Sequence, residues 1–208
     1  MSSKKKIVVL VSGSGTNLQA IIDAIGNGIL TNTEIAVVIS NKKDAFALKR
    51  AKSAGIEAVF IDPKGFNSNE FDKKLIDIIR NYRGDLIVLA GYMRILTGDF
   101  INAFPNQIIN IHPALLPNFG GKGMYGKYVH EAVLKSGVKE SGCTVHFVTT
   151  DVDAGPIIAQ KKVPVILGDT VDTLSKRILV EEHKLLVEAI ERVLSGFVIP
   201  TKAGIQKH

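Results

Sequence analysis

The chain has 208 residues, of which 46% are hydrophobic and 22% charged, and its net charge is +6. This composition excludes a disordered or low-complexity protein, and the length predicts a single domain with one sizeable core. A single cysteine, Cys143, excludes an intrachain disulfide and a cysteine-rich zinc site. We expect Cys143 to be a small core residue in a reducing compartment.

The N-terminal segment lacks the features of a signal peptide. Lys4–Lys6 precede the apolar run Ile7–Val11, which is shorter than the roughly 7–15 apolar residues of a signal peptide and has no small-residue cleavage site after it. We therefore expect a first β-strand. No run of about 18 apolar residues is present, so a membrane span is not expected. The predicted location is the cytoplasm, a reducing setting that fits the single cysteine.

Strand-like apolar runs alternate with helix-period segments over the first hundred residues. The predicted strands are Ile7–Ser12, Glu34–Ser40, Glu57–Ile61 and Asp85–Ala90, and the predicted helices between them are Asn17–Ile25, Ala45–Ala54 and Glu70–Tyr82. Runs such as IVVLV and LIVLA are apolar at every position, which is typical of parallel strands buried on both faces. The sequence therefore predicts an α/β protein with a Rossmann-like, mostly parallel sheet and helices on both faces.

The second half of the chain follows a different pattern. A short helix at Asp99–Phe104 and a fifth strand at Gln107–Asn110 lead to a glycine-rich loop, and the expected elements after it are a helix at Tyr128–Lys135, hairpin-type strands at Thr144–Thr149 and Pro156–Val165, and a long terminal helix at Asp169–Ser195. We expect antiparallel C-terminal strands within one domain, 1–208, with halves at 6–118 and 119–196 and a tail at 197–208.

Ser12–Leu18 joins the first strand to the first helix. Glycines allow backbone amides to approach an anion, and the helix N-terminus offers free N–H groups. The segment is not a Walker A loop, and it lacks the third glycine and the following acidic residue of a dinucleotide fingerprint. It predicts a cradle for a single phosphate; a tight glycine turn without a ligand is the alternative.

Asn110 and His112 stand at the end of the fifth strand. Residues two apart in a strand share a face, so both side chains point to the edge where open α/β sheets bind ligands. An amide N–H and an imidazole directed at one point suit a developing oxyanion, although a structural histidine is an equal alternative.

Two further acidic positions are candidates. In Asp151–Pro156 a carboxylate could raise the pKa of a histidine and relay protons, or the segment could be a solvated turn. Glu182 falls on the apolar stripe of the last helix, so it is either a helix-edge residue or a contact for hydroxyl groups or an amine. The sequence places no Ser or Cys nucleophile near these groups, which favours direct transfer. The five histidines lack paired metal-ligand spacing, so no metal is expected.

Four segments together resemble the folate-dependent formyltransferase family: SGSGTNLQ at Ser12–Gln19, GYMRIL at Gly91–Leu96, NIHPALLP at Asn110–Pro117, and HFV at His146–Val148 with DVDAGP at Asp151–Pro156. The first segment resembles the branch of the family that acts in purine biosynthesis. The resemblance covers about residues 6–195. It implies the formyltransferase fold and direct transfer, through a tetrahedral intermediate, of the formyl group of 10-formyltetrahydrofolate to the amine of glycinamide ribonucleotide. The products are N-formylglycinamide ribonucleotide and tetrahydrofolate.

The resemblance also implies roles for individual residues. Asn110, His112 and Asp153 match the family's catalytic trio, and Gly15, Thr16 and Asn17 match its phosphate-binding residues. Glu182 matches a ribose-binding residue. The folate-binding positions are Met93, Arg94, Ile95, Leu96, Asn110, Thr149, Thr150, Asp151, Val152 and Asp153. The 6–118 half would then bind the nucleotide, and the 119–196 half the folate.

Some positions depart from the family or depend on it alone. A family arginine that approaches the formyl donor aligns with Asn69, and Lys64 is the candidate substitute. The family places Gly120–Tyr128 over the active site as a mobile loop, so we expect disorder there without ligands. It also implies a cis Leu116–Pro117 bond.

Three other functions are alternatives to this reaction. A methionyl-tRNA formyltransferase would carry an added nucleic-acid-binding domain, which is not expected here. A formyltetrahydrofolate deformylase would use the same trio to hydrolyse the donor, and a non-catalytic nucleotide- or folate-binding protein would not transfer the group at all. The expected partners are the ribonucleotide and the formyl folate, with no nucleic acid and no membrane, in a monomer or homodimer.

Overall fold

A computed structural model describes residues 3–201 and 204–207, and the chain divides into two compact units between Ile109 and Asn110. We call them unit 1 and unit 2. Unit 1 contains β1 (Lys5–Val11), α1 (Thr16–Gly26), β2 (Thr33–Ser40), α2 (Phe46–Ser53), β3 (Ala58–Phe60), α3 (Ser68–Tyr82), β4 (Leu86–Leu89), α4 (Gly98–Ala103) and the start of β5 (Ile108–His112). Unit 2 contains the end of β5, α5 (Lys127–Ser136), β6 (Glu140–Phe147), β7 (Ile157–Pro164), α6 (Val171–Leu194), β8 (Val198–Thr201) and β9 (Gly204–Lys207).

The sheet of unit 1 is parallel. Its strand order is β3-β2-β1-β4, with the start of β5 next to β4. Every side chain of Ile7–Val11 is inaccessible to solvent, which is the burial that a central strand covered on both faces requires. The predicted parallel sheet is confirmed.

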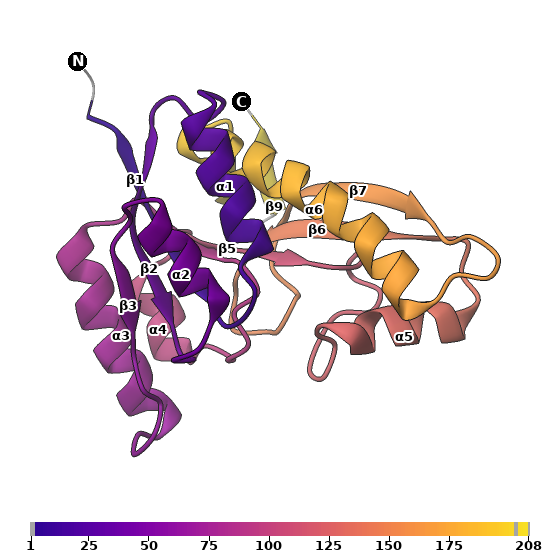
Figure 1. Cartoon of the computed structure of the whole chain (residues 1–208), viewed down its shortest axis with the longest axis horizontal. Helices are drawn as coiled ribbons and strands as arrows, with labels where there is room; N and C mark the ends of the chain where they lie inside the picture. The colour runs from indigo at the N-terminus through magenta and orange to yellow at the C-terminus, as the bar shows by residue number, and fades with distance from the viewer. Residues whose placement is uncertain (1–2, 202–203, 208) are drawn as a thin grey trace. The chain divides into compact units, whose positions relative to one another are not determined.

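The helices of unit 1 form two pairs. α1 contacts α2, and α3 contacts α4 (Figure 1). The chain moves outward from β1 to β2 and β3 through α1 and α2, and it returns through α3 to β4 on the other side of β1. Because such crossovers are right-handed, a reversal of direction puts the later helices on the opposite face. Helices on both faces are therefore confirmed.

Unit 2 is built on an antiparallel pair. The end of β5 is followed in the sheet by β6 and β7, which run antiparallel to each other, and α6 packs along both of them (Figure 1). The buried face of α6 consists of Leu174, Ile178, Glu182, Leu185, Leu186, Ala189 and Ile190. This confirms the antiparallel C-terminal strands and the long terminal helix. No helix within the described residues is long and apolar enough to cross a membrane.

Two segments differ from the sequence prediction. β6 begins at Glu140 rather than at the predicted Thr144. The added part contains Gly142, where a Cβ would lie 2.0 Å from the Lys161 carbonyl oxygen. Glycine weakens a strand pattern, so the extension was missed. In addition, β8 and β9 form an antiparallel pair within the expected tail.

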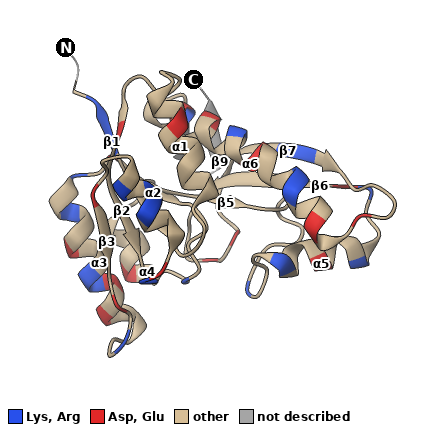
Figure 2. Cartoon of the chain, in the orientation of Figure 1, with Lys and Arg blue, Asp and Glu red and all other residues tan. Residues whose placement is uncertain are grey.

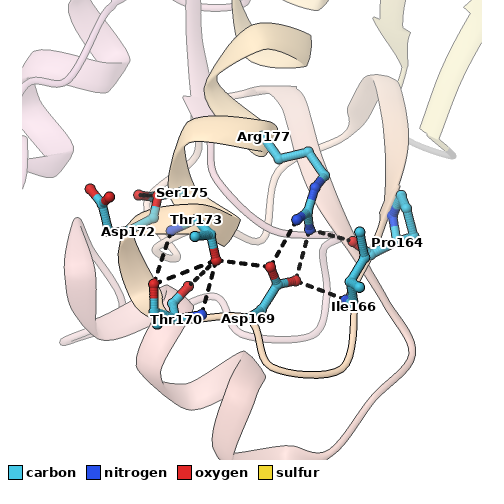
Figure 3. Close-up of polar contacts among 8 residues, drawn as sticks. All are labelled: Pro164, Ile166, Asp169, Thr170, Asp172, Thr173, Ser175 and Arg177. Atoms are coloured by element: carbon cyan, nitrogen blue, oxygen red, sulfur yellow. Dashed lines mark hydrogen bonds and ion pairs between the residues drawn. The ribbon is translucent and has the colours of Figure 1, made fainter.

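Asp169 organises the entry into α6 (Figure 3). Its carboxylate accepts two hydrogen bonds from the Arg177 guanidinium, at 2.8 Å each, one from the Ile166 N–H and one from the Thr173 hydroxyl. Arg177 also donates to the Pro164 carbonyl. The hydrogen bonds from Arg177 and Ile166 hold the pKa of Asp169 far below its ordinary value of 3.8.

Asp169→Asn should lower the thermal unfolding temperature at pH 7. A carboxyl whose pKa is depressed in the folded state stabilises the fold above its unfolded pKa, and that contribution is lost as the pH falls through the folded pKa. The difference in unfolding temperature between the variant and the parent chain should therefore be largest at neutral pH and shrink below about pH 4. Thermal unfolding followed by circular dichroism between pH 7 and pH 3 measures it.

Asp172→Asn is the matched control, because the Asp172 carboxylate forms an i,i+4 pair with the exposed Lys176 on the first turn of α6. Such surface pairs contribute little. An Asp172→Asn variant that loses as much stability as Asp169→Asn would contradict the assigned role.

Candidate active site

Three polar side chains meet in unit 2. Asn110 and His112 lie two residues apart on β5, and Asp153 lies in the turn between β6 and β7. The His112 Nδ1 is 3.5 Å from the Asp153 Oδ2. The His112 ring is 4% exposed and the Asp153 side chain only 11% exposed. The predicted proximity of His112 and Asp153, which are 41 positions apart in the chain, is therefore present in the structure.

The hydrogen bond at the far side of the ring sets the tautomer of His112. Its Nε2 lies 2.8 Å from the Phe119 carbonyl oxygen, which can only accept. In the neutral ring Nε2 therefore carries the proton, and Nδ1 presents its lone pair to Asp153. Protonation of Nδ1 turns this contact into an ion pair.

Burial, rather than Asp153, dominates the pKa of His112. Burial lowers the pKa of His112 more than Asp153 and the Phe119 carbonyl raise it, so the pKa lies below its ordinary value of 6.5. Asp153 raises the pKa of His112, as the sequence analysis expected, but this effect is smaller than that of burial. The pKa of Asp153 is also lowered: burial raises it, but His146, His112 and the Gly121 N–H outweigh burial.

His146 is a member of the cluster that the sequence analysis did not assign to the site. It lies on β6 and is 2% exposed, and its Nδ1 is 2.9 Å from the Phe147 carbonyl oxygen. Its Nε2 therefore lacks a proton in the neutral ring, and it accepts from the Asn110 Nδ2 at 3.2 Å. The same Nε2 lies 3.6 Å from the Asp153 Oδ1. His146 thus fixes the orientation of the Asn110 amide, whose second N–H stays available for another acceptor.

Glycines shape the backbone around Asp153, which itself adopts a left-handed φ of 56°. The Gly121 N–H donates to the Asp153 Oδ2 at 3.0 Å. A Cβ on Gly120 would lie 3.1 Å from the Asp153 Cβ, and one on Gly155 would lie 1.8 Å from the Phe147 carbonyl oxygen. The turn can place Asp153 beside His112 only because these positions carry no side chain.

Thr144 holds the segment after β5. Its hydroxyl donates to the Ala114 carbonyl at 2.6 Å and accepts from the Leu116 N–H at 3.1 Å, while Gln160 donates to both Thr144 and the Leu116 carbonyl. The Leu116–Pro117 bond is cis, as the resemblance implied. The expected mobility of Gly120–Tyr128 without ligands stays a prediction; in the structure Gly121 contacts Asp153, and α5 begins at Lys127.

The predicted phosphate loop of unit 1 has the required backbone. Gly15 adopts a left-handed φ of 73° and is the N-cap of α1, and Thr16 and Asn17 form the first turn of that helix. A Cβ on Gly15 would lie 2.6 Å from the Ala47 Cβ and 2.7 Å from the Ala47 Cα. Only glycine fits here, so the first N–H groups of α1 can be presented to an anion.

Met93, Arg94, Ile95 and Leu96 also lie in unit 1, in the segment between β4 and α4. The Met93 N–H donates to the Ser12 hydroxyl at 2.8 Å, and the Thr97 N–H donates to the buried Asp72 at 2.7 Å. The segment is therefore held at both ends, while Met93 and Ile95 are 49% and 60% exposed. A fixed backbone flanked by exposed apolar side chains fits the edge of a flat ring system.

The remaining candidates are placed as follows. Asn69 lies in the first turn of α3 and Lys64 in the loop before it, and both are exposed. Glu182 is buried on the apolar face of α6. Thr149, Thr150, Asp151 and Val152 lead from β6 into the turn that carries Asp153. Cys143 is a free, buried residue, and burial raises the pKa of its thiol to about 12, as expected for a core position.

A carboxamide, a buried imidazole and a carboxylate next to it, on an α/β scaffold, define a site suited to acyl-group transfer. The chain matches the family model described as formyl transferase over residues 5–190, and it belongs to that family.

Several named relatives resemble the chain. It is 44% identical over 194 residues to a chloroplastic phosphoribosylglycinamide formyltransferase of Arabidopsis thaliana, covering 90% of this chain and 64% of that protein. It is 44% identical over 180 residues to the phosphoribosylglycinamide formyltransferase of Escherichia coli K12, covering 86% of this chain and 82% of that protein. It spans only 19% of the human trifunctional purine biosynthetic protein adenosine-3, again at 44% identity, with 94% of this chain covered.

A solved structure is similar to the whole of this chain. The glycinamide ribonucleotide transformylase 1 of Symbiobacterium toebii is 45% identical, with a TM-score of 0.93 and coverage of 100% of this chain and 95% of that one. The formyltransferase fold predicted from the sequence is confirmed.

Proposed function

We propose that this chain transfers the formyl group of 10-formyltetrahydrofolate to the amine of glycinamide ribonucleotide. The observation that carries the proposal is the cluster of Asn110, His112 and Asp153 in unit 2, with His112 Nδ1 3.5 Å from the Asp153 carboxylate. The names of the relatives, which include a phosphoribosylglycinamide formyltransferase at 82% coverage of its length, support the same reaction.

The reaction exchanges one bond for another. A bond forms between the acceptor amine nitrogen and the formyl carbon, and the bond between that carbon and the folate nitrogen breaks. One proton passes from the amine to the departing nitrogen, and nothing is oxidised or reduced. The products are N-formylglycinamide ribonucleotide and tetrahydrofolate. The chain must therefore stabilise a tetrahedral oxyanion and assist one proton transfer.

Asn110 and His112 are assigned to the oxyanion. The free N–H of the Asn110 amide and the His112 Nε2–H are both donors, and the latter exchanges the Phe119 carbonyl for the substrate oxygen. Negative charge on that oxygen favours the imidazolium. Asp153, whose pKa lies below its ordinary value of 3.8, is ionised at neutral pH; it stabilises that cation through Nδ1 and takes part in the proton path.

The binding roles complete the proposal. Gly15, Thr16 and Asn17 hold the ribonucleotide phosphate and Glu182 its ribose. The backbone of Met93–Leu96 and of Thr149–Asp153 holds the folate ring, and Lys64 or Asn69 takes the position of the family arginine. We propose a monomer or homodimer that needs no metal. The proposed compartment is the cytoplasm, a reducing setting that agrees with the free buried thiol of Cys143.

The test is to incubate the chain with 10-formyltetrahydrofolate, with and without glycinamide ribonucleotide, and to follow loss of the formyl group. We expect loss only when the ribonucleotide is present, with formation of the formylated ribonucleotide in equal amount. Loss without the ribonucleotide would identify a deformylase. Binding of both ligands without loss of the formyl group would identify a non-catalytic binding protein, and either result would overturn the proposal.

A further inference from the structure

The N-terminal half of α2 packs directly against the phosphate loop in unit 1. The Ala47 N–H donates to the Gly13 carbonyl at 3.1 Å, and the Arg50 Nε donates to the Ser14 carbonyl at 2.9 Å. Ala47 also fills the space next to Gly15 that a side chain there would need. Two successive carbonyl groups of the loop are thus bound to one helix.

These two bonds determine where the N–H groups of the loop point. In a trans peptide the C=O and the following N–H point in opposite directions. Because the carbonyls of Gly13 and Ser14 are directed at α2, the N–H groups of Ser14 and Gly15 are directed away from it. They lie next in sequence to the first N–H groups of α1, which have no partner within that helix. Backbone N–H groups gathered in this way make an anion-binding concavity.

Arg50 connects this loop to α1 as well. Its Nη1 donates to the Gln19 Oε1 at 3.0 Å, and the Gln19 Nε2 donates to Asp23, which sets the orientation of the amide. The guanidinium also lies over the Phe46 ring, 4.9 Å from its centroid. Figure 2 shows the basic residues of α2, and among them only Arg50 has a hydrogen bond to the loop within the part of the chain that the structure describes.

We propose that Arg50 is a positioning residue for the ribonucleotide phosphate. It holds the Ser14 peptide so that the Gly15 N–H faces the anion, and it ties the loop to the first turns of α1. This inference rests on the proposed function, because it takes the phosphate of the acceptor as the ligand of the loop. A guanidinium is required because its rigid fork reaches Ser14 and Gln19 together, whereas an ammonium group cannot reproduce both directed bonds.

The test compares two acceptors, glycinamide ribonucleotide and the riboside that lacks the phosphate, in steady-state kinetics with saturating formyl donor. For Arg50→Met we expect KM for the ribonucleotide to rise at least about tenfold, the scale of a lost hydrogen bond to a charged group. The kcat should stay within about threefold, and kcat/KM for the riboside and KM for the donor should stay within about twofold. A general folding defect would lower kcat/KM for both acceptors alike.

Two further variants separate the effect of the directed hydrogen bonds of Arg50 from the effect of its positive charge. Lys49→Met removes the same charge from the neighbouring, exposed residue of α2, so it should change KM for the ribonucleotide by less than about twofold. Arg50→Lys keeps the charge and loses the fork, so we expect it to resemble Arg50→Met more than the parent chain.

Each contrary outcome has a defined meaning. A parental KM in Arg50→Met, equal losses in Arg50→Met and Lys49→Met, or a parental KM in Arg50→Lys would overturn the positioning role while the proposed function stands. If the unmodified chain does not distinguish the ribonucleotide from the riboside, the loop does not bind the phosphate. That part of the proposed function then fails, and the role of Arg50 fails with it.

Discussion

Asp153→Asn should reduce kcat by at least about 10²-fold while leaving the fold intact. The substitution removes the negative charge that faces His112 Nδ1 at 3.5 Å. Asp153 raises the pKa of His112 against the opposing effect of burial, so its loss lowers that pKa further. Forming the imidazolium that stabilises the oxyanion then costs more free energy. Single-turnover kinetics of formyl transfer measure the loss directly.

The Asp153→Asn variant tests the loss of charge alone, because the backbone at this position tolerates asparagine. Asp153 has a φ of 56°, a conformation that Asn adopts more readily than most residues, and the Asn oxygen can still accept from the Gly121 N–H. Asp172→Asn on α6 serves as a control for the loss of one carboxylate in unit 2. An unfolding temperature close to that of the parent chain together with near-parental turnover would reject the assignment of Asp153.

Gly15→Val should weaken ribonucleotide binding by about 10²-fold or more and spare folate binding. The new Cβ would lie 2.6 and 2.7 Å from the Ala47 Cβ and Cα, and the φ of 73° is strained for any branched side chain. The loop must move away from α2, and its N–H groups lose their alignment. Calorimetric titration of each ligand separately measures the two affinities.

Neighbouring glycines supply the matched comparison. Gly13 has open space around its Cβ position, whereas Gly15 does not, so Gly13→Ala should bind the ribonucleotide far better than Gly15→Ala. Equal loss of affinity for the ribonucleotide and the folate in Gly15→Val would count against a phosphate-specific loop.

Much of the scaffold could be predicted because its physical basis is local. IVVLV at Ile7–Val11 is apolar on both faces, and a strand buried on both faces needs helices on either side of the sheet. The apolar stripe of α6 predicted the long terminal helix, and Glu182 was correctly placed on its buried face. The start of β6 was missed because Gly142, which the close approach of the Lys161 carbonyl requires, interrupts a strand pattern.

The site was predictable only in part. Asn110 and His112 share a face of β5 by simple alternation, but the approach of Asp153 to His112 depends on a turn with a left-handed φ and on two glycines. The net pKa of His112 could not be read from its partner alone, since burial outweighs the carboxylate.

The contributions of His146 and Arg50 involve backbone carbonyls. His146 acts on Asn110 only because the Phe147 carbonyl fixes its tautomer, and Arg50 holds the carbonyl of Ser14. Every residue except proline offers the same carbonyl and N–H groups, so such contacts leave no pattern in the sequence.

Ser12 carries a consequence for redesign. Its hydroxyl donates to Asn41 at 2.6 Å and accepts from the Met93 N–H at 2.8 Å, and its own N–H donates to the Gly91 carbonyl. One small side chain is thus shared by the segment that would hold the acceptor and the segment that would hold the donor. Attempts to engineer a new acceptor by rebuilding the first segment will also shift the second, so libraries should vary residues 12 and 41 together instead of one at a time.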